Sequence, residues 1–290
     1  MIAAPRQSFT LAIPGRAPLV LGPRTLVMGV INVTPDSFSD GGKSLDPVQA
    51  RDLAQAMEAA GADILDIGAE STRPGAPPVG TAEELARLRP VLAALAGAVS
   101  IPISIDTYKA SVAAVALDAG ASIVNDISAI EYDPQMGPLV AARGVPAILM
   151  HTRGRPEDMY AHAEYGDVVG EVSADLQRAV DRAIRAGVAR RQLVVDPGLG
   201  FAKKAAQTLD ALVGLDRLAA LGLPILAGPS RKSFVTFATG PLPVEDRDWP
   251  TAAAVTAAVL GGAHIVRVHA VEKMIHVVRV ADALRRAAGA

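Results

Sequence analysis

The chain has 290 residues, half of them hydrophobic, and its formal net charge is -2. That length suits one large domain or two small ones, and the near-neutral charge offers no footprint for nucleic acid or an acidic membrane surface. The sequence contains no cysteine, which excludes disulfides and thiolate-bound metals, and only 3% of its residues are aromatic, which argues against a surface that stacks on bases.

The N-terminal segment MIAAPRQSFT lacks the basic and then apolar pattern of a signal peptide. No apolar run approaches the length of a membrane span without glycine, proline or charge. We therefore expect a soluble cytoplasmic protein. Residues Ser8 to Leu21 alternate apolar and polar types around Pro14 and Gly15, which predicts a β-hairpin ahead of the main fold.

After the hairpin, short apolar runs alternate with helical patterns. The runs predict eight strands at Leu26–Asn32, Ile64–Gly68, Ile101–Asp106, Ser122–Asp126, Ala147–His151, Leu193–Asp196, Pro224–Ala227 and Ile265–His269. Helical spacing predicts helices at Leu45–Ala60, Ala82–Ala96, Lys109–Ala119, Asp167–Ala186 and Thr208–Leu221, a short segment at Pro138–Arg143, and a closing helix to about Ala288. Asp46 is the expected N-cap of the first helix, ahead of Pro47 at its first position.

This alternation decides the fold class. The strands are continuous apolar runs, as expected when protein covers both faces of a sheet. Right-handed β-α-β crossovers repeated eight times close into a (β/α)8 barrel, and the length agrees. An open doubly wound sheet is the alternative, but its frequent G-x-G-x-x-G turn is absent. We predict an α/β fold, a single (β/α)8 TIM barrel over residues 25–290 with an N-terminal β-hairpin extension over residues 1–24.

Polar or ionisable residues lie at or just after the end of each predicted strand. They are Asn32, Glu70, Thr72, Asp106, Asn125, His151, Asp196, Ser230, Lys232, Arg267 and His269. The carboxyl ends of barrel strands form the active-site face, so these groups must pair there with one another or with a ligand. Arg267 and His269 are two residues apart and share one strand face, where they suit a diphosphate or carboxylate. The carboxylates of Asp106 and Asp196 and the amide of Asn125 suit a ring rich in N–H groups at the other end of such a ligand.

Eight segments of the chain together resemble dihydropteroate synthase. In order they are MGVINVTPDSFSDGG, DILDIGAESTRPGA, SIDTYKA, VNDI, LMHTRG, DPGLGFAKK, GPSRKSF and RVHAV. They run from about Thr25 to Val271, and the first two are long and specific. The resemblance implies a transferase that joins 6-hydroxymethyl-7,8-dihydropterin diphosphate to p-aminobenzoate and releases pyrophosphate in folate biosynthesis.

The resemblance also implies a pterin site and a mechanism. The residues assigned to the pterin are Asp106, Asn125, Asp196 and Lys232. The implied reaction is dissociative: pyrophosphate leaves the pterin methylene, a cation spreads over the ring, and the neutral aniline nitrogen attacks. Charge separation is the barrier, so catalysis is electrostatic and needs no covalent nucleophile. Asp196 would stabilise the positive charge on the ring.

For the diphosphate, the resemblance assigns Thr72, Arg267 and His269, with Arg73 assisting from the same loop as Thr72. Asn32 corresponds to the residue that helps to bind Mg²⁺ beside the diphosphate. A single amide ligand suits Mg²⁺, which keeps its waters and binds substrate phosphates. Arg267, His269 and the metal would then stabilise the departing pyrophosphate.

The resemblance extends to the second substrate and to assembly. Ser230, with groups near Phe38 and near Pro74 in the loop Ser71–Ala76, resembles the p-aminobenzoate pocket for which sulfonamides compete. We expect this loop and Thr34–Gly42 to close over the substrates and exclude water. The family forms homodimers, and the alanine-rich helix Thr251–Leu260 suits close packing of two copies.

Other ionisable residues are interpreted as structural. Asp66 is expected to be a buried structural carboxylate, and the residues interpreted as helix-start or loop charges are Lys109, Lys203 and Arg231. Glu70 and His151 stay open between a structural and a direct role. Three positions depart from the family pattern: Ala202 where glycine is common, Ala270 where aspartate is common, and Ala69, which replaces one small residue by another.

Two alternatives remain from the sequence. One is a related pterin-binding barrel such as the methyltetrahydrofolate-binding domain of a methyltransferase. It would share the pterin-holding carboxylate and amide, but it has no reason to keep SFSDGG, STRPGA, SRK and RVH together. The other is a catalytically silent homologue that binds pterin and regulates.

Overall fold

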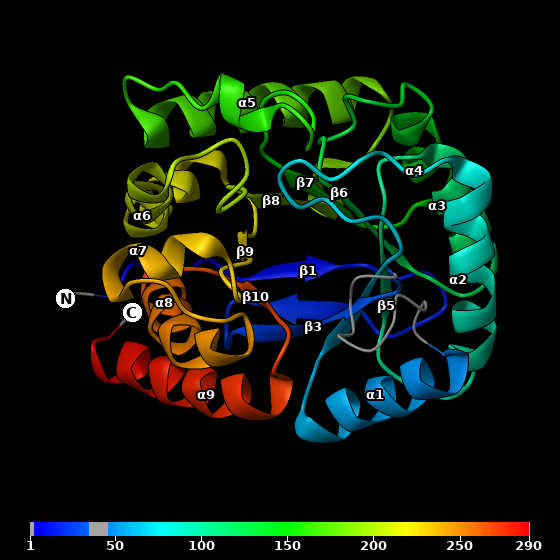
Figure 1. Ribbon diagram of the computed structural model, residues 1–290, viewed down its shortest axis with the longest axis horizontal. Helices are drawn as coiled ribbons and strands as arrows, with labels where there is room; N and C mark the ends of the chain where they lie inside the picture. The colour runs from blue at the N-terminus through cyan, green and yellow to red at the C-terminus, as the bar shows by residue number, and fades with distance from the viewer. Residues whose placement is uncertain (1–2, 35–45, 290) are drawn as a thin grey trace.

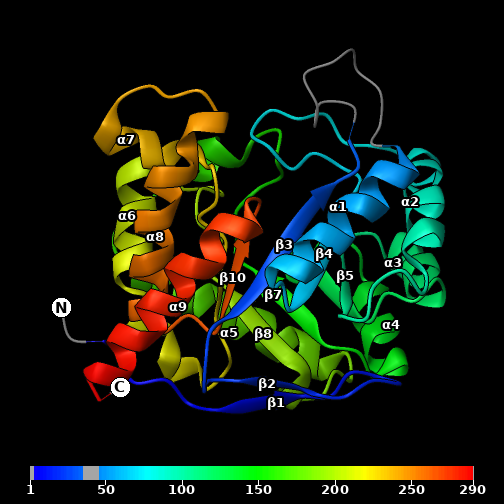
Figure 2. The same cartoon turned by 90° about the horizontal axis from the view of Figure 1, so that it is seen from below.

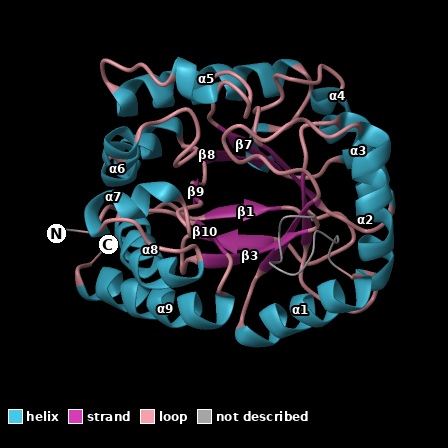
Figure 3. Cartoon of the chain, viewed as in Figure 1, coloured by secondary structure: helices cyan, strands magenta, loops and turns pink. Residues whose placement is uncertain are grey.

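A parallel β-barrel surrounded by helices makes up most of the molecule (Figures 1 and 3). The computed structural model describes residues 3–34 and 46–289, and within them eight parallel strands follow the order β8-β7-β6-β5-β4-β3-β10-β9. A bridge between Val195 and Ile225 brings the two edges of this sheet together. The predicted (β/α)8 barrel is therefore confirmed. No helix within the described ranges is both long and apolar enough to span a membrane.

The barrel strands lie where the apolar runs predict them. They are β3 (Leu26–Asn32), β4 (Ile64–Gly68), β5 (Ile103–Asp106), β6 (Ile123–Asp126), β7 (Ala147–Met150), β8 (Leu193–Asp196), β9 (Leu226–Ala227) and β10 (Ile265–Val268). The strands β3, β4 and β8 begin and end at the predicted residues. The others are one or two residues shorter than predicted.

The helices alternate with these strands along the chain. They are α1 (Pro47–Ala60), α2 (Thr81–Leu95), α3 (Ala110–Asp118), α4 (Met136–Arg143), α5 (Val168–Arg185), α6 (Ala205–Val213), α7 (Thr236–Thr239), α8 (Asp248–Leu260) and α9 (Val271–Ala287). The predicted cap of α1 is confirmed, because Val48 N donates to Asp46 Oδ1 at 2.7 Å and Pro47 follows the cap.

One predicted helix, Thr208–Leu221, is wrong as a single element. The helix α6 ends at Val213, and a 3-10 helix runs from Leu215 to Leu221. Gly214 separates the two and lies against α5, where an added Cβ would come within 2.7 Å of Val169. Close packing against α5 therefore sets this break, and the helical spacing of the sequence does not reveal it.

The barrel interior has an apolar floor. The predicted hairpin is confirmed as β1 (Phe9–Leu11) paired antiparallel with β2 (Leu19–Leu21), and it lies across the N-terminal end of the barrel (Figure 2). The floor residues, packed with the hairpin, are Leu11, Ile13, Leu21, Leu26, Met28, Ile64, Ile123, Ile148, Val194, Leu226 and Ile265.

A polar layer lies above this floor. Side chains two residues apart on a strand share a face, so the next interior residues after Ile64, Ile123, Val194 and Ile265 are Asp66, Asn125, Asp196 and Arg267. Strand alternation alone thus places ionisable groups on an apolar base at the C-terminal mouth. Charges held there by low-dielectric surroundings interact strongly with one another.

His264 ties the N-terminal segment to the barrel floor. Ile225 N donates to its Nδ1 at 3.0 Å, and its Nε2 lies 3.0 Å from the Gln7 carbonyl oxygen. The neutral ring with the proton on Nε2 satisfies both contacts. Burial lowers the pKa of His264 to about 4, because a second proton would place Nδ1–H against the Ile225 N–H.

We expect the free energy of unfolding to fall as the pH drops from 6.5 toward 4. In that window His264 is protonated in the unfolded chain but neutral in the folded one, so acid favours unfolding. Urea titrations at pH 7 and pH 5 should show that His264→Gln loses less stability on acidification than the native chain, by about 2 kcal/mol. Equal losses in the two proteins would contradict this assignment.

Candidate active site

Arg267 lies across the C-terminal mouth of the barrel. Its Nε donates to Asp66 Oδ2 at 2.6 Å, and its Nη2 donates to Asp106 Oδ2 at 2.7 Å. The Asp66 side chain is fully buried and that of Arg267 is 19% exposed. Burial opposes the charge of the guanidinium, but Asp66 and Asp106 keep the pKa of Arg267 above its usual value. The predicted residues Arg267 and Asp106 are thus brought together from β10 and β5.

Asp66 has a larger place in this site than the sequence interpretation gave it. Asn125 Nδ2 donates to the same Asp66 Oδ2 at 3.0 Å, so one oxygen joins Asn125 to Arg267. Gly68, two residues further along β4, leaves room for Asp106, because an added Cβ would lie 3.3 Å from Asp106 Cβ. The sequence signal for this role is the position of Asp66 two residues after the floor residue Ile64.

The carboxyl groups of the mouth are incompletely neutralised. Burial raises the pKa of Asp106 to about 7, although Arg267 opposes the shift. Burial likewise raises the pKa of Asp196, against the charge of Lys232. Gly198 N donates to Asp196 Oδ1 at 2.7 Å. A ligand that donates N–H bonds or carries positive charge would stabilise both carboxylates.

Lys232 reaches the mouth from the segment after β9. Its Nζ donates to the Leu199 carbonyl oxygen at 2.6 Å and lies 4.5 Å from the centre of the Phe201 ring. Both contacts belong to the loop after β8. Burial lowers the pKa of Lys232 to about 8, with Asp196 acting in the opposite direction. The lysine therefore stands beside Asp196, as expected for a shared binding surface.

His269 and Ser230 form a pair at the same mouth. The His269 backbone N–H donates to Ser230 Oγ at 3.1 Å, and His269 Nδ1 lies 2.9 Å from that oxygen. Burial, together with Arg267 and further cations that include Arg73, lowers the pKa of His269 to about 3. The ring is thus neutral, and a proton donated by Ser230 to Nδ1 leaves Nε2 as an N–H donor. Neutral imidazole among cations is suited to binding an anion.

Arg231 separates Ser230 from Lys232 and holds a left-handed backbone with φ of 57°. Its guanidinium forks onto Asp248 at the start of α8, at 2.7 and 3.1 Å. A left-handed residue other than glycine costs about 1–2 kcal/mol, which this two-bonded ion pair offsets. The side chain of Arg231, interpreted as a loop charge, is thus engaged with α8, while its neighbours contact His269 and Leu199.

The loop after β4 carries Thr72, which is half-buried, and Arg73, which is exposed. Glu70 anchors the start of this loop. Tyr108 OH donates to Glu70 Oε1 at 2.8 Å, and Lys109 Nζ pairs with its other carboxylate oxygen. The role of Glu70 was left open by the sequence. In the structure, its contacts with Tyr108 and Lys109 fix the start of this loop.

Asn32 is the last residue of β3 and pairs in register with Gly68. It shares the interior face of that strand with Met28, so it belongs to the same mouth as Arg267. In the described part of the chain, no group of three or more His, Cys, Asp or Glu residues could hold a metal ion. Phe38 and most of the loop Thr34–Gly42 lie outside the described residues.

Lys203, interpreted as a helix-start or loop charge, lies in the loop just before α6 but is buried. It is only 1% exposed, and its Nζ lies 2.9 Å from His151 Nδ1. His151 is buried as well, and burial and the charge of Lys203 lower its pKa well below the usual value. The sequence alone does not distinguish a buried lysine from an exposed one: Lys203 is buried, and the adjacent Lys204 is exposed.

Comparison with known proteins gives matches over nearly the whole chain. A family model described as pterin binding enzyme matches residues 28–269. The dihydropteroate synthase of Synechocystis sp. is 48% identical over 265 residues, which cover 91% of this chain and 92% of that protein. The matched range includes the residues of the barrel mouth, from Asn32 to His269.

Solved structures give the same result. Xanthomonas albilineans dihydropteroate synthase with 4-aminobenzoic acid is 41% identical with a TM-score of 0.89, over 96% of this chain and 99% of that one. The structure of the enzyme from the same organism in complex with 7,8-dihydropteroate is 38% identical with a TM-score of 0.84, over 95% and 98%.

Proposed function

The chain belongs to the dihydropteroate synthases of the pterin binding enzyme family, and we propose that the residues of its barrel mouth hold the substrates of that reaction. The reaction condenses 6-hydroxymethyl-7,8-dihydropterin diphosphate with p-aminobenzoate, giving 7,8-dihydropteroate and pyrophosphate in folate biosynthesis. The observation that carries the assignment of roles is one connected network: Arg267 bonds both Asp106 and Asp66, and Asn125 bonds the same Asp66 oxygen.

The pterin ring is proposed to lie against Asp106, Asn125, Asp196 and Lys232. A pterin presents N–H donors, a carbonyl and ring nitrogens on its edges. The carboxylates of Asp106 and Asp196 would accept the N–H bonds, and Asn125 and Lys232 would donate to ring acceptors. The raised pKa values of both carboxyl groups support this, since bound donors would relieve the cost of burying them.

The diphosphate is proposed to lie toward Arg267 and the neutral His269, with Thr72 and Arg73 from the loop after β4. The bond between the pterin methylene carbon and the diphosphate oxygen breaks with its electron pair going to the leaving oxygen. Arg267 and the Nε2–H of His269 would stabilise that oxygen, and Asp196 would stabilise the ring cation. The p-aminobenzoate nitrogen, placed near Ser230, then bonds to the methylene carbon and loses a proton.

Mg²⁺ is proposed as the cofactor, with Asn32 as its protein ligand. The amide oxygen of Asn32 is a hard donor of the type that Mg²⁺ accepts, and it stands on the interior face of β3 beside the strand of Arg267. Because no group of three or more His, Cys, Asp or Glu among the described residues could hold a metal ion, diphosphate oxygens and waters would complete the coordination. When bound, Mg²⁺ would neutralise charge on the leaving pyrophosphate.

The chain is also proposed to form a homodimer through α8. Ala253 is exposed on this helix, and such a small side chain allows close approach of a second helix. Trp249, at the start of α8, is 86% exposed, and such a large apolar side chain at a surface suits burial by a partner.

Lys232→Ala and Arg267→Ala are expected to affect different steps. Lys232→Ala should raise the KM for the pterin substrate, and Arg267→Ala should lower kcat, each by about 100-fold, because one loses binding and the other loses stabilisation of developing charge. Dihydropteroate and pyrophosphate are followed together, with the exposed Lys204→Ala as control. If the native chain binds pterin but forms neither product, the silent homologue is the correct reading.

Removal of Mg²⁺ by a chelator should abolish turnover, and added Mg²⁺ should restore it. Asn32→Ala should raise the Mg²⁺ concentration for half-maximal activity about tenfold, as expected for loss of a single ligand. Calorimetry of pyrophosphate binding with and without Mg²⁺ gives a second readout. An unchanged Mg²⁺ dependence in Asn32→Ala would remove this residue from the metal site.

Sedimentation equilibrium should give a mass of twice the 29.8 kDa of one chain. Ala253→Glu places a charge on the outward side of α8, so it should shift the mass to that of the monomer. The matched control is Ala288→Glu, at the exposed end of α9. A monomeric native chain, or a dimer indifferent to Ala253→Glu, would contradict an α8 interface.

A further inference from the structure

Lys203 is a buried lysine with three acceptors around its Nζ, and burial lowers its pKa to about 7, against the charge of Asp196. In the described part of the chain, Nζ lies 2.9 Å from His151 Nδ1, 3.2 Å from the Gly198 carbonyl oxygen and 3.1 Å from the Phe201 carbonyl oxygen. An ammonium group has three N–H donors, and these acceptors match them. Such a side chain fixes the atoms around it, because loss of the donors would leave buried acceptors without partners.

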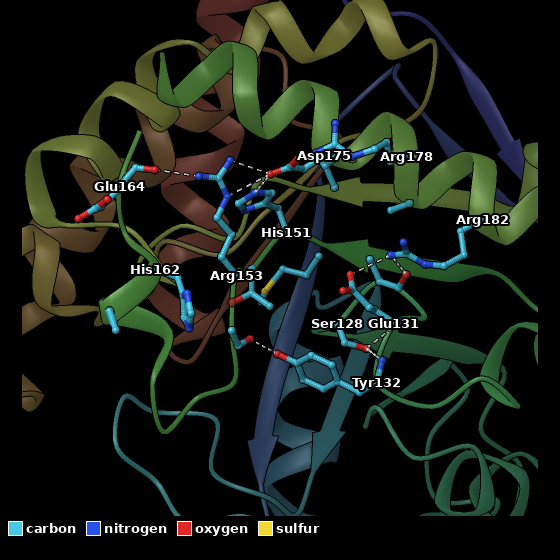
Figure 4. A pocket seen from close by; sticks show the side chains of 17 residues that line it. Ser128, Glu131, Tyr132, His151, Arg153, His162, Glu164, Asp175, Arg178 and Arg182 are labelled. Atoms are coloured by element: carbon cyan, nitrogen blue, oxygen red, sulfur yellow. Dashed lines mark hydrogen bonds and ion pairs between the residues drawn. The ribbon is translucent and has the colours of Figure 1, made fainter. Parts of the chain in front are cut away.

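The His151 side chain that contacts Lys203 is itself held by Asp175, and Figure 4 shows His151, Asp175 and Arg153 together. Since His151 Nδ1 accepts from Lys203, the ring proton is on Nε2, which donates to Asp175 Oδ2 at 3.0 Å. Arg153 donates to the same Asp175 oxygen at 3.2 and 3.0 Å. Asp175 stands on α5 and lines a cavity of about 690 Å³ between α5 and the loops after β6 and β7. The lysine is thus braced from β7 and α5.

The loop after β8, residues 198–201, contacts both Lys203 and Lys232. The carbonyls bound by Lys203 are those of Gly198 and Phe201, and the carbonyl between them, on Leu199, accepts from Lys232 Nζ at 2.6 Å. The Phe201 ring lies 4.5 Å from the same Nζ. A shift of this loop would therefore move both contacts of Lys232 at once.

The loop has a backbone that needs such support. Gly198, Gly200 and Ala202 have φ values of 64°, 80° and 47°, in the left-handed region. Alanine adopts this region only at a cost, so the conformation persists because the surroundings fix it. Gly198 also packs tightly on β7, since an added Cβ would lie 1.9 Å from the His151 carbonyl oxygen.

We propose that Lys203 is a positioning residue for pterin binding. Braced by His151 and Asp175, it fixes the loop 198–201 so that Leu199 and Phe201 hold the ammonium group of Lys232 in place. The inference rests on the proposed role of Lys232 at the pterin. Lys203 itself would not contact the substrate, and it would act only through Lys232.

The first test is Lys203→Met, which removes the donors and keeps the length of the side chain. The KM for the pterin diphosphate should rise roughly 10- to 100-fold, because charged hydrogen bonds that order the site are lost. The kcat and the KM for p-aminobenzoate should change little. Lys204→Met, at the exposed neighbouring lysine, is the matched control and should behave as the native enzyme.

A double-mutant cycle separates positioning from a general structural role. If Lys203 acts through Lys232, then Lys203→Met combined with Lys232→Met should bind pterin no more weakly than Lys232→Met alone. Additive losses would overturn the proposal, as would an unchanged pterin KM in a folded Lys203→Met. If Lys232→Met itself leaves pterin binding intact, the proposed role of Lys232 fails first.

A second variant covers the case in which Lys203→Met does not fold. Asp175→Ala removes the brace of His151 at the rim of the cavity and leaves Lys203 in place. It should raise the same pterin KM by a smaller factor and show the same non-additivity with Lys232→Met. Urea unfolding of each variant establishes that the folded state is being compared, and an unchanged pterin KM here would overturn the proposal.

Discussion

The ion pair of Arg267 with Asp66 and Asp106 organises the mouth of the barrel. A guanidinium above an apolar floor is stable only if carboxylates meet it, because desolvation of an unpaired charge costs several kcal/mol. The carboxylates of Asp106 and Asp196 are in turn costly to bury, since burial raises the pKa of both although Arg267 and Lys232 lie beside them. Such a site suits a ligand that donates N–H bonds on one side and develops positive charge during reaction. Burial of these carboxylates destabilises the free protein, and the same carboxylates would stabilise positive charge on a bound substrate.

Strained backbone accompanies the same site. Arg231 and Ala202 hold left-handed conformations, and they precede Lys232 and Lys203, which contact the Leu199 carbonyl oxygen and His151. Arg231 is held by Asp248, and the Ala202 carbonyl oxygen accepts from Tyr165 OH at 2.9 Å. Contacts from α8 and from the segment before α5 thus hold these two residues in backbone conformations that are otherwise unfavourable. Contacts outside the barrel mouth therefore help to hold the loops that carry Lys203 and Lys232.

Much of this arrangement could be predicted from the sequence, for physical reasons that particular residues show. The strands β3, β4 and β8 were placed correctly because buried parallel strands are short apolar runs with polar ends. The gathering of Asp106, Asn125, Asp196 and Arg267 followed from barrel geometry. The role of Asp66 was not predicted: its place two residues after Ile64 puts it in the same layer, but only the folded structure shows that its Oδ2 bonds both Arg267 and Asn125. The burial of Lys203 was missed for a similar reason, because it depends on His151 and α5 packing behind it.

The departures from the family pattern fall on backbone positions and not on the polar side chains of the mouth. Ala202 occupies a left-handed position where the family commonly has glycine, so it strains the loop without removing a donor or acceptor. Ala270 is the N-cap of α9, and since alanine has no side-chain acceptor, no side-chain hydrogen bond caps that helix. Both changes cost stability locally, and the fork of Arg267 and the pair of His269 with Ser230 form without them. The chain therefore keeps the chemistry of the site while its supporting backbone varies.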